Sequence, residues 1–243
     1  MNKRLKILVT NDDGVCAEGI SKLAAAASQL GDVWVVAPEK QCSGMSQRVT
    51  IAEKLIVKPV NFPIDVRGAY SVSGTPADCV SAALTLLGEL RPDFVFSGIN
   101  EGCNAGFDIA NSGTIGAAME AVQSGIPAIA FSVYEKGGWE LVDEHLLPIT
   151  RELMAQPQEA GIVWNVNFPA VPAGELKGVL RERRIAPVHL YRTVFDREAL
   201  PDGTEELKLK LAMAGPDDVE EGTDIHALLH GYISVGRVKC AVM

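Results

Sequence analysis

Continuous apolar segments of strand length alternate with longer segments of helical periodicity over the first two thirds of the chain. The apolar segments occupy residues 6–10, 32–39, 93–99, 127–133 and 161–167. The helical segments occupy residues 19–30, 73–88, 112–124 and 141–155. Strands that are apolar on both faces are typical of a parallel sheet covered by helices on either side. The pattern therefore predicts an α/β fold with a mostly parallel sheet.

Local signals set several boundaries of these elements. Gly31 is expected to end the first helix, because glycine commonly follows the last helical residue. In the second helix Thr75 is a suitable N-cap, Pro76 fits the first helical position, and Asp78 favours the positive end of the helix dipole. The segment 49–60 (VTIAEKLIVKPV) is expected to be a strand pair or an excursion from the sheet.

The pattern changes near residue 179. Two runs, 187–195 and 206–213, flank the turn sequence PDG, and LKLKLAM alternates apolar residues with lysine, as a half-solvated antiparallel strand does. We predict a β-hairpin arm here and, because its apolar face needs a cover, an oligomer interface. The closing sequence ALLHGYISV predicts a helix that turns into a strand. The chain is thus divided into a core at 1–178 and an arm with a closing segment at 179–243.

Polar side chains gather where the predicted parallel strands end, the edge at which open parallel sheets bind their ligands. These residues are Asn11, Asp12, Asp13, Ser43 and Asn100. Their carboxylate, hydroxyl and amide oxygens suit a hard cation such as Mg²⁺, Mn²⁺ or Ca²⁺. Two adjacent carboxylates repel each other unless a proton or a cation intervenes, so they indicate a bound metal. The alternative is that one of them only caps the following helix.

A phosphate site is expected beside these oxygens. Ser112, Gly113 and Thr114 begin a helix after the loop EGCNAGFDIANSGT, and the backbone N–H groups at a helix N-terminus attract anions. The alternative is an ordinary N-cap without a ligand. A hard metal next to an anion site polarises a phosphoryl oxygen and lowers the pKa of water, so the pattern predicts hydrolysis of a phosphate ester.

Composition and charge narrow the range of partners. Lys and Arg total 22 against 31 Asp and Glu, and a net charge of −9 would repel DNA or RNA over most of the surface. No run reaches the ~18 apolar residues that span a membrane, and the first apolar run is too short for a secretory signal. A cytoplasmic protein is therefore expected. Five cysteines without a C-x-x-C pair argue against a disulfide framework and a zinc knuckle.

Other classes of phosphate-handling protein compete for the same residues. Aspartyl-phosphate phosphatases place two aspartates at i and i+2, but the residue two positions before Asp13 is Asn11, which is no nucleophile. Phospho-receiver domains need an aspartate at the end of a later strand, where this chain has SGIN. The loop CSGMSQR, which begins at Cys42, matches the C-x5-R pattern of cysteine-dependent phosphatases. A helix should follow such a loop, whereas 49–57 predicts β structure. A sensor that binds a nucleotide without hydrolysing it is a further alternative.

Five ordered motifs cover nearly the whole chain: TNDDG, APEKQCSGMSQ, SGTPADC, SGINEGCNAG and NSGTIGAAMEA. In this order and spacing, with WNVNFP and GTDIHALLHGYISV further on, they resemble the SurE (survival protein E) family of metal-dependent nucleotidases. The resemblance implies a Rossmann-like three-layer α/β domain with a C-terminal hairpin extension that takes part in homodimers or homotetramers. It also implies removal of phosphate from nucleoside 5′- or 3′-monophosphates and, in some members, from short polyphosphate.

The resemblance further implies roles for individual residues. One divalent cation per subunit, Mg²⁺ or Mn²⁺, would be held by Asp12, Asp13, Ser43 and Asn100. The phosphate would be bound by Asn11, Gly44, Asn104, Ser112, Gly113 and Thr114. Asp12 and Asp13 would also be the catalytic residues, because no general base is evident and either could orient the attacking water. Structural roles are expected for the histidines, which lie far in sequence from the motifs: His145, His189, His226 and His230.

Several positions depart from the usual family pattern. Gln41 and Cys42 stand where arginine or another polar residue is usual, and Asn111 stands where an aromatic residue is common. Glu101 adds a negative charge after SGIN. These changes are expected to affect base preference and phosphate affinity more than the metal ligands. Ile225 replaces an aromatic residue after GTD, and this change is expected to alter an oligomer contact.

Overall fold

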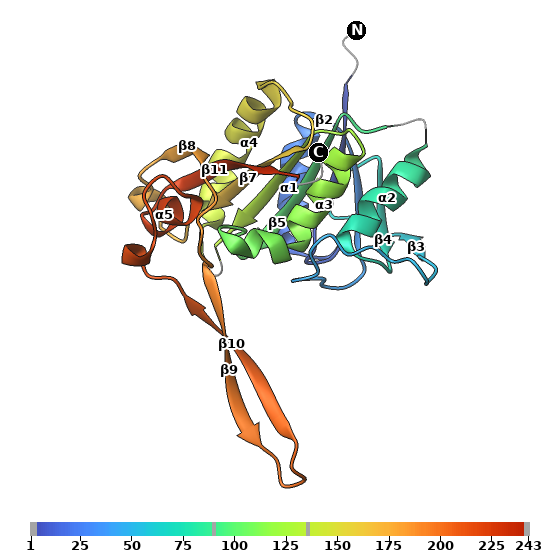
Figure 1. Ribbon diagram of the computed structural model, residues 1–243. Coiled ribbons are helices and arrows are strands. Elements are labelled where there is room, and N and C mark those ends of the chain that lie inside the picture. The colour runs from blue at the N-terminus through green and yellow to red at the C-terminus, as the bar shows by residue number, and fades with distance from the viewer. Residues whose placement is uncertain (1–3, 89–90, 135–136, 241–243) are drawn as a thin grey trace.

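A nine-stranded sheet forms the centre of the structure, a computed structural model that describes residues 4–88, 91–134 and 137–240 (Figure 1). The order across the sheet is β3-β4-β2-β1-β5-β6-β7-β11-β8. The strands are β1 (Leu5–Thr10), β2 (Gly31–Pro38), β3 (Val57–Pro59), β4 (Gly68–Val72), β5 (Phe94–Glu101), β6 (Ala128–Val133), β7 (Ile162–Phe168), β8 (Val179–Arg183) and β11 (Ile233–Lys239). The six strands from β4 to β7 are mutually parallel, whereas β3 and β11 run antiparallel to β4 and β7. The predicted mostly parallel sheet is confirmed.

Helices cover both faces of this sheet, with α1 (Glu18–Ser28) and α4 (Trp139–Ala155) on one face and α2 (Pro76–Leu87) and α3 (Gly113–Gln123) on the other. Val9 of β1 packs in the same core as Ile20 and Leu141, while the preceding Leu8 packs in the second core with Ile115. Successive strand residues point to opposite faces, and this is why β1 is apolar at consecutive positions. The predicted three-layer, Rossmann-like arrangement is confirmed. Among the described residues, no helix has the length and apolar character needed to cross a membrane.

The predicted start of α2 is confirmed, whereas the predicted end of α1 is wrong. Thr75 caps α2: Asp78 N donates to Thr75 Oγ1 (3.2 Å), Thr75 N donates to Asp78 Oδ2 (2.9 Å), and Pro76 is the first helical residue. Gly31 does not end α1. It is the first residue of β2, where it pairs with Leu5 of the neighbouring strand β1. A Cβ at Gly31 would lie 2.3 Å from Leu5 O, so glycine is needed for the close approach of the two strands.

Two strands of the sheet were not predicted, and one segment contains less strand than expected. The missed strands are β4 (GAYSV) and β8 (VLRER), neither of which has a long apolar run. In the segment 49–60 only Val57–Pro59 forms a strand, so this segment is an excursion and not a strand pair.

β9 (Tyr191–Ala199) and β10 (Glu205–Met213) form the predicted hairpin, which projects from the body of the molecule (Figure 1). The two strands are antiparallel, and Leu209 lies opposite Phe195. As predicted, a helix, α5 (Asp224–Leu229), then leads into β11. β8 and β11 belong to the central sheet, so within the described part of 179–243 it is the hairpin of β9 and β10 that departs from the body.

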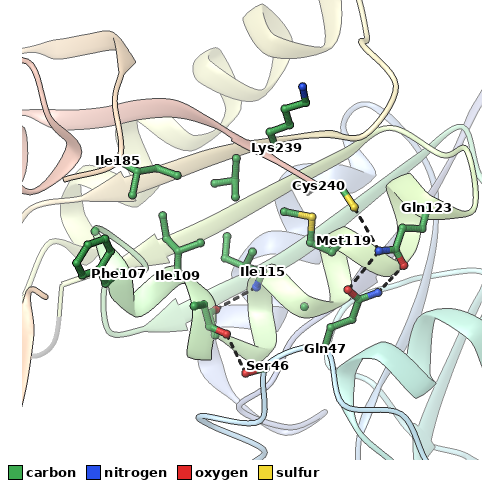
Figure 2. Close-up of a pocket in the computed structure, with 15 residues that line it drawn as sticks. Ser46, Gln47, Phe107, Ile109, Ile115, Met119, Gln123, Ile185, Lys239 and Cys240 are labelled. Carbon is green, nitrogen blue, oxygen red and sulfur yellow. Dashed lines mark hydrogen bonds between the residues drawn. The ribbon is translucent and has the colours of Figure 1, made fainter. Parts of the chain in front are cut away.

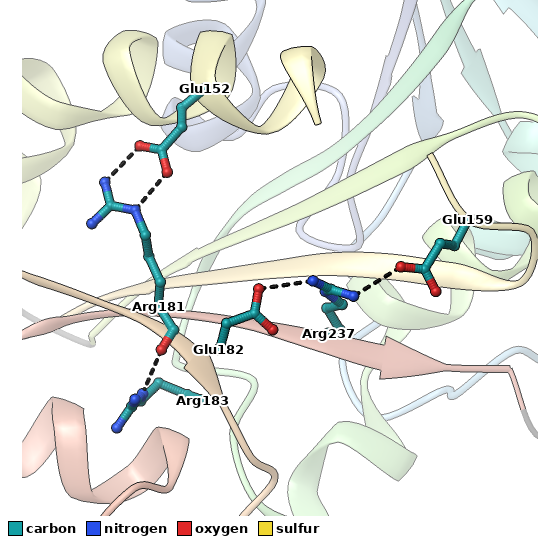
Figure 3. A network of polar contacts seen from close by, with 6 residues as sticks. All are labelled: Glu152, Glu159, Arg181, Glu182, Arg183 and Arg237. Atoms are coloured by element: carbon teal, nitrogen blue, oxygen red, sulfur yellow. Dashed lines mark hydrogen bonds and ion pairs between the residues drawn. The ribbon is translucent and has the colours of Figure 1, made fainter. Parts of the chain in front are cut away.

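Ion pairs fasten the sheet edge that the closing segment forms (Figure 3). Arg181 of β8 donates two hydrogen bonds to Glu152 of α4, each 2.5 Å long. Arg237 of β11 donates to Glu159 (2.9 Å) and to Glu182 (2.8 Å). Exposed ion pairs each contribute little stability, but together these pairs link β8 and β11 to α4 and to the segment that precedes β7.

Candidate functional site

A tight turn at the end of β1 carries the acidic pair. Asn11 holds this turn with its side chain: Nδ2 donates to Gly14 O (2.9 Å), and Oδ1 accepts from Gly14 N (3.2 Å). Gly14 has a φ of +100°, a conformation that favours glycine. Asn11 is fully buried and is not among the residues that line the cavity described below. Its amide therefore serves the turn.

Asp12 lies buried against the first turn of α3. The residue is 3% exposed, and its Oδ1 accepts a hydrogen bond from Thr114 Oγ1 at 2.5 Å. A Cβ at Gly113 would lie 2.8 Å from Asp12 Cβ and 3.0 Å from Oδ2, so glycine is required for this approach. Burial raises the pKa of Asp12 from 3.8 to about 6; the hydrogen bond from Thr114 opposes this rise and the charge of Asp13 adds to it. A cation beside this carboxylate would favour its ionised form.

Asp13 is less buried than Asp12 and has different partners. Its Oδ2 accepts from Glu101 N at 3.2 Å, and its Oδ1 accepts from Gln41 Nε2 at 3.4 Å. The partner in Glu101 is the backbone, and the residue itself is exposed. Asp13 thus connects the turn after β1 with the ends of β2 and β5, the convergence that the sequence predicts.

Amide side chains organise the loop that follows β5. Asn100 Nδ2 donates to Gly102 O (2.5 Å), which leaves Asn100 Oδ1 as an oxygen with no donor among the described residues. Asn104 N donates to Asn167 Oδ1 (2.8 Å), and Asn104 Nδ2 donates to Ser132 Oγ (2.8 Å). The loop is therefore fixed by the ends of β6 and β7, and its Asn100 oxygen suits a cation.

A cavity of about 290 Å³ collects most of these groups. The predicted site residues that line it are Asp12, Ser43, Gly44, Asn100, Asn104 and Ser112. Gly113 and Thr114 lie directly behind Asp12, and Asp13 adjoins the lining residue Glu101. In the part of the chain that the structure describes, no three His, Cys, Asp or Glu side chains are grouped as metal ligands. A cation in this cavity would therefore need hydroxyl and amide oxygens besides the two carboxylates.

The lining residues that sequence reasoning missed include Asp108, Tyr191 and Thr193. Asp108 Oδ1 is 2.6 Å from His189 Nδ1, and Asp108 Oδ2 accepts from Tyr191 N at 2.8 Å. Cys103 N in turn donates to Tyr191 Oη at 3.1 Å. The base of the hairpin is therefore bound to the site loop. The one sequence signal for Asp108 was that it is an acidic residue in a loop rich in Gly and Asn.

A larger cavity, of about 510 Å³, takes residues from the 3₁₀ turn η1 (Phe107–Asn111), which also contributes to the first cavity (Figure 2). Ile115 and Met119 belong to its mainly apolar wall, and at one end Gln47 Nε2 donates to Gln123 Oε1 at 2.7 Å. Among the described residues, no carboxylate lines this larger cavity. We therefore assign the chemistry to the smaller one.

Cys42 lacks the properties of a thiolate nucleophile. Burial raises the pKa of its thiol, and the charges of Asp12 and Asp78 raise it further. Reactive cysteines instead have a lowered pKa. After Arg48 the chain is irregular and the expected β structure begins only at Val57, so the helix of a C-x5-R phosphatase is missing from this part of the described chain. The structure does not support the cysteine-dependent alternative.

Comparisons with known proteins agree with the motifs. A family model described as Survival protein SurE matches residues 7–187. The 5'-nucleotidase SurE of Neisseria gonorrhoeae is 38% identical over 233 residues, which cover 95% of this chain and 91% of that protein. The 5'-nucleotidase SurE of Christiangramia forsetii is 39% identical over 244 residues, with 98% and 93% coverage. The crystal structure of the SurE protein from Aquifex aeolicus matches with a TM-score of 0.81 and 35% identity over 96% of this chain and 93% of that one. Because the family model and these relatives match most of its length, this chain belongs to the SurE (survival protein E) family.

Proposed function

We propose that this chain is a metal-dependent nucleotidase that hydrolyses the phosphate monoester of nucleoside 5′- or 3′-monophosphates, with short polyphosphate as a further substrate. The observation that carries the proposal is the buried Asp12, which lies beside Asp13 and against the N-terminus of α3 in one polar cavity. The activity in the names of the relatives supports it. The cytoplasmic location expected from the sequence stays a prediction.

The donors around the cavity fit one hard divalent cation, Mg²⁺ or Mn²⁺. Asp12, Asp13, Ser43 and Asn100 would hold it, because they offer carboxylate, hydroxyl and amide oxygens and neither an imidazole nitrogen nor a thiolate sulfur. When bound, such an ion polarises a phosphoryl oxygen and makes water a better nucleophile. Either carboxylate could accept a hydrogen bond from that water and orient it.

The α3 N-terminus would receive the phosphate. Ser112 caps this helix, accepting from Ile115 N at 3.0 Å. The first N–H groups of a helix have no acceptor within it, so those of Gly113 and Thr114 can offset negative charge on phosphoryl oxygens. Gly44 and Asn104 line the same cavity. Asn11 would act indirectly, by fixing the turn that presents Asp12.

We further propose that the hairpin arm joins copies of the chain into a homodimer or a homotetramer. One face of the arm carries exposed apolar side chains: Phe195 at 54%, Leu207 at 57% and Leu209 at 53%. The alternating Lys208 and Lys210 occupy the opposite face. An exposed apolar face of this kind needs a cover, and a second copy supplies one of matching chemistry. In this division the core at 1–178 holds the metal ligands, and 179–243 holds the interface.

Phosphate release from AMP by the purified chain tests the activity. Release is expected with Mg²⁺ or Mn²⁺ and is lost with EDTA, and a panel of nucleoside monophosphates then gives base and phosphate-position preference. Binding of AMP without release would instead favour the nucleotide sensor. A Cys42→Ser variant should keep its turnover, whereas a thiolate mechanism would lose it.

The Asp13→Asn variant tests the site itself. Metal-dependent turnover should fall at least about a hundredfold while the circular dichroism spectrum is unchanged, because a neutral amide cannot supply the charge that a divalent ion needs. Asp143→Asn is a matched control, since Asp143 is an exposed aspartate on α4 that pairs with Lys22. Unchanged turnover in Asp13→Asn, or an equal loss in the control, would reject the proposed ligands.

A further inference from the structure

Two histidines of α5 and its C-cap are stacked on each other away from the candidate active site. His226 and His230 are separated by one helical turn, their ring centres are 4.0 Å apart and their planes differ by 24°. Neither residue lines the cavity that holds Asp12. Both are partly buried, so the rings are held by packing yet reach solvent.

A backbone contact fixes the hydrogen on one of the rings. His230 Nδ1 lies 2.8 Å from the carbonyl oxygen of His226. A carbonyl oxygen can only accept, so Nδ1 of His230 must carry the hydrogen. In the neutral ring the lone pair is then on Nε2. Metal-binding histidines are commonly oriented in this way, with one ring nitrogen donating to a backbone carbonyl and the other bound to the metal.

The second ring lies in surroundings that favour its neutral form. Burial lowers the pKa of His226, and the neighbouring His230 and Arg183 lower it further, against the opposing charge of Glu221. Two charged imidazolium rings in a stack would also repel each other. A neutral imidazole is the form that binds a metal ion.

We propose that His226 and His230 form a two-ligand site for a borderline transition-metal ion, of which Zn²⁺ is the probe we choose. The i, i+4 spacing places both rings on one side of the helix, and imidazole nitrogen suits Zn²⁺, Cu²⁺ and Ni²⁺ much better than Mg²⁺. A ring nitrogen binds a metal in the plane of its ring, and the two stacked planes do not meet at one ion. The His226 ring, which makes no hydrogen bond among the described contacts, therefore turns out of the stack when the ion binds. No third His, Cys, Asp or Glu joins the pair among the residues the structure describes. Water completes the coordination, and the ion remains accessible from solvent.

Zinc titration by calorimetry, with the full chain in a large excess of Mg²⁺, tests the site. Excess magnesium competes for the proposed oxygen ligands around Asp12, and the His226→Asn variant identifies the part of the zinc signal that comes from the histidines. One zinc ion per chain is expected to bind, and His226→Asn should weaken that binding at least about tenfold. His230→Asn loses the hydrogen bond to His226 O and could therefore fail to fold. The His226 ring makes no hydrogen bond among the described contacts, so His226→Asn tests the zinc site without that risk.

Two variants serve as controls. His145→Asn removes a histidine of α4 that lies 3.8 Å from Glu144, and Cys16→Ser removes an exposed thiol. Both should bind zinc like the unmodified chain. Nitrogen NMR of the rings should also show His230 with hydrogen on Nδ1 and a zinc-dependent shift at its Nε2. Absence of zinc binding, unchanged affinity in His226→Asn, or an equal loss in either control would overturn the proposal.

Discussion

The close approach of α3 to the acidic pair makes Gly113→Ala the most informative single change. The substitution adds one methyl group at the first residue of a helix, and alanine is the better helix former, by roughly 0.5–1 kcal/mol in a helix interior and so by no more than that here. That methyl carbon would lie 2.8 Å from Asp12 Cβ, 3.0 Å from Asp12 Oδ2 and 3.1 Å from Cys42 O. One change thus favours the helix and crowds the proposed metal ligand.

The size of the effect follows from these distances. Carbon atoms pack best about 3.5–4.0 Å apart, so Asp12 and α3 must separate by roughly half an ångström or more. A misplacement of about 1 Å at a catalytic group costs about a hundredfold in rate, and we therefore expect kcat/KM to fall roughly tenfold to a hundredfold. Overpacking costs about 1–3 kcal/mol, which the gain in helix propensity partly offsets. Stability should fall by no more than about 2 kcal/mol.

Phosphate release from AMP at saturating Mg²⁺ gives kcat and KM, and urea unfolding gives the free energy of unfolding of the same preparations. Gly174→Ala is the matched control, because a Cβ there meets no atom within 4 Å and the residue has no positive φ. The control should keep both its activity and its stability. Unchanged kcat/KM in Gly113→Ala would refute the inference that the approach of α3 positions Asp12.

Three further predictions concern the rest of the molecule. Thr75→Ala should lower the free energy of unfolding by about 1 kcal/mol in urea, because it removes the cap of α2. Burial acts to raise the pKa of Asp78, but hydrogen bonds from Thr50 and Thr75 outweigh it and lower the pKa below its usual 3.8. The ionised Asp78 carboxylate therefore stabilises the fold above pH 3.8, and this contribution is lost as the pH falls through its lower folded-state pKa. The free energies of unfolding of the unmodified chain and of Asp78→Asn should therefore become more similar as the pH is lowered. Leu209→Lys should shift the proposed oligomer toward monomer in light scattering with little change in secondary structure.

Most of the central sheet could be predicted because its longer buried strands are mainly apolar. Leu8 and Val9 enter different cores, so a strand covered on both faces, such as β1, is apolar at consecutive positions. β4 could not be predicted in this way, although it lies inside the sheet between β3 and β2. Its sequence GAYSV is only five residues long, and Ser71 is buried at 5% exposure without making the segment apolar. The hairpin could be predicted from the alternation of apolar residues with lysine in β10. The exact ends of its strands could not, because the strands are exposed and no change in burial marks where they begin or end.

The two sides of the candidate site differ in how far the sequence reveals them. Asp12 and Ser43 come from loops that follow β1 and β2, and Asn100 lies at the end of β5, so the topology of a parallel sheet is enough to bring them together. The opposite wall depends on contacts between distant segments, since Asp108 meets His189 across 81 positions. Whether a loop carboxylate faces solvent or anchors the base of a hairpin is decided by tertiary packing, and the local sequence around Asp108 is the same in either case. The chemistry at the strand ends was therefore open to prediction, whereas the wall built by β9 required the structure.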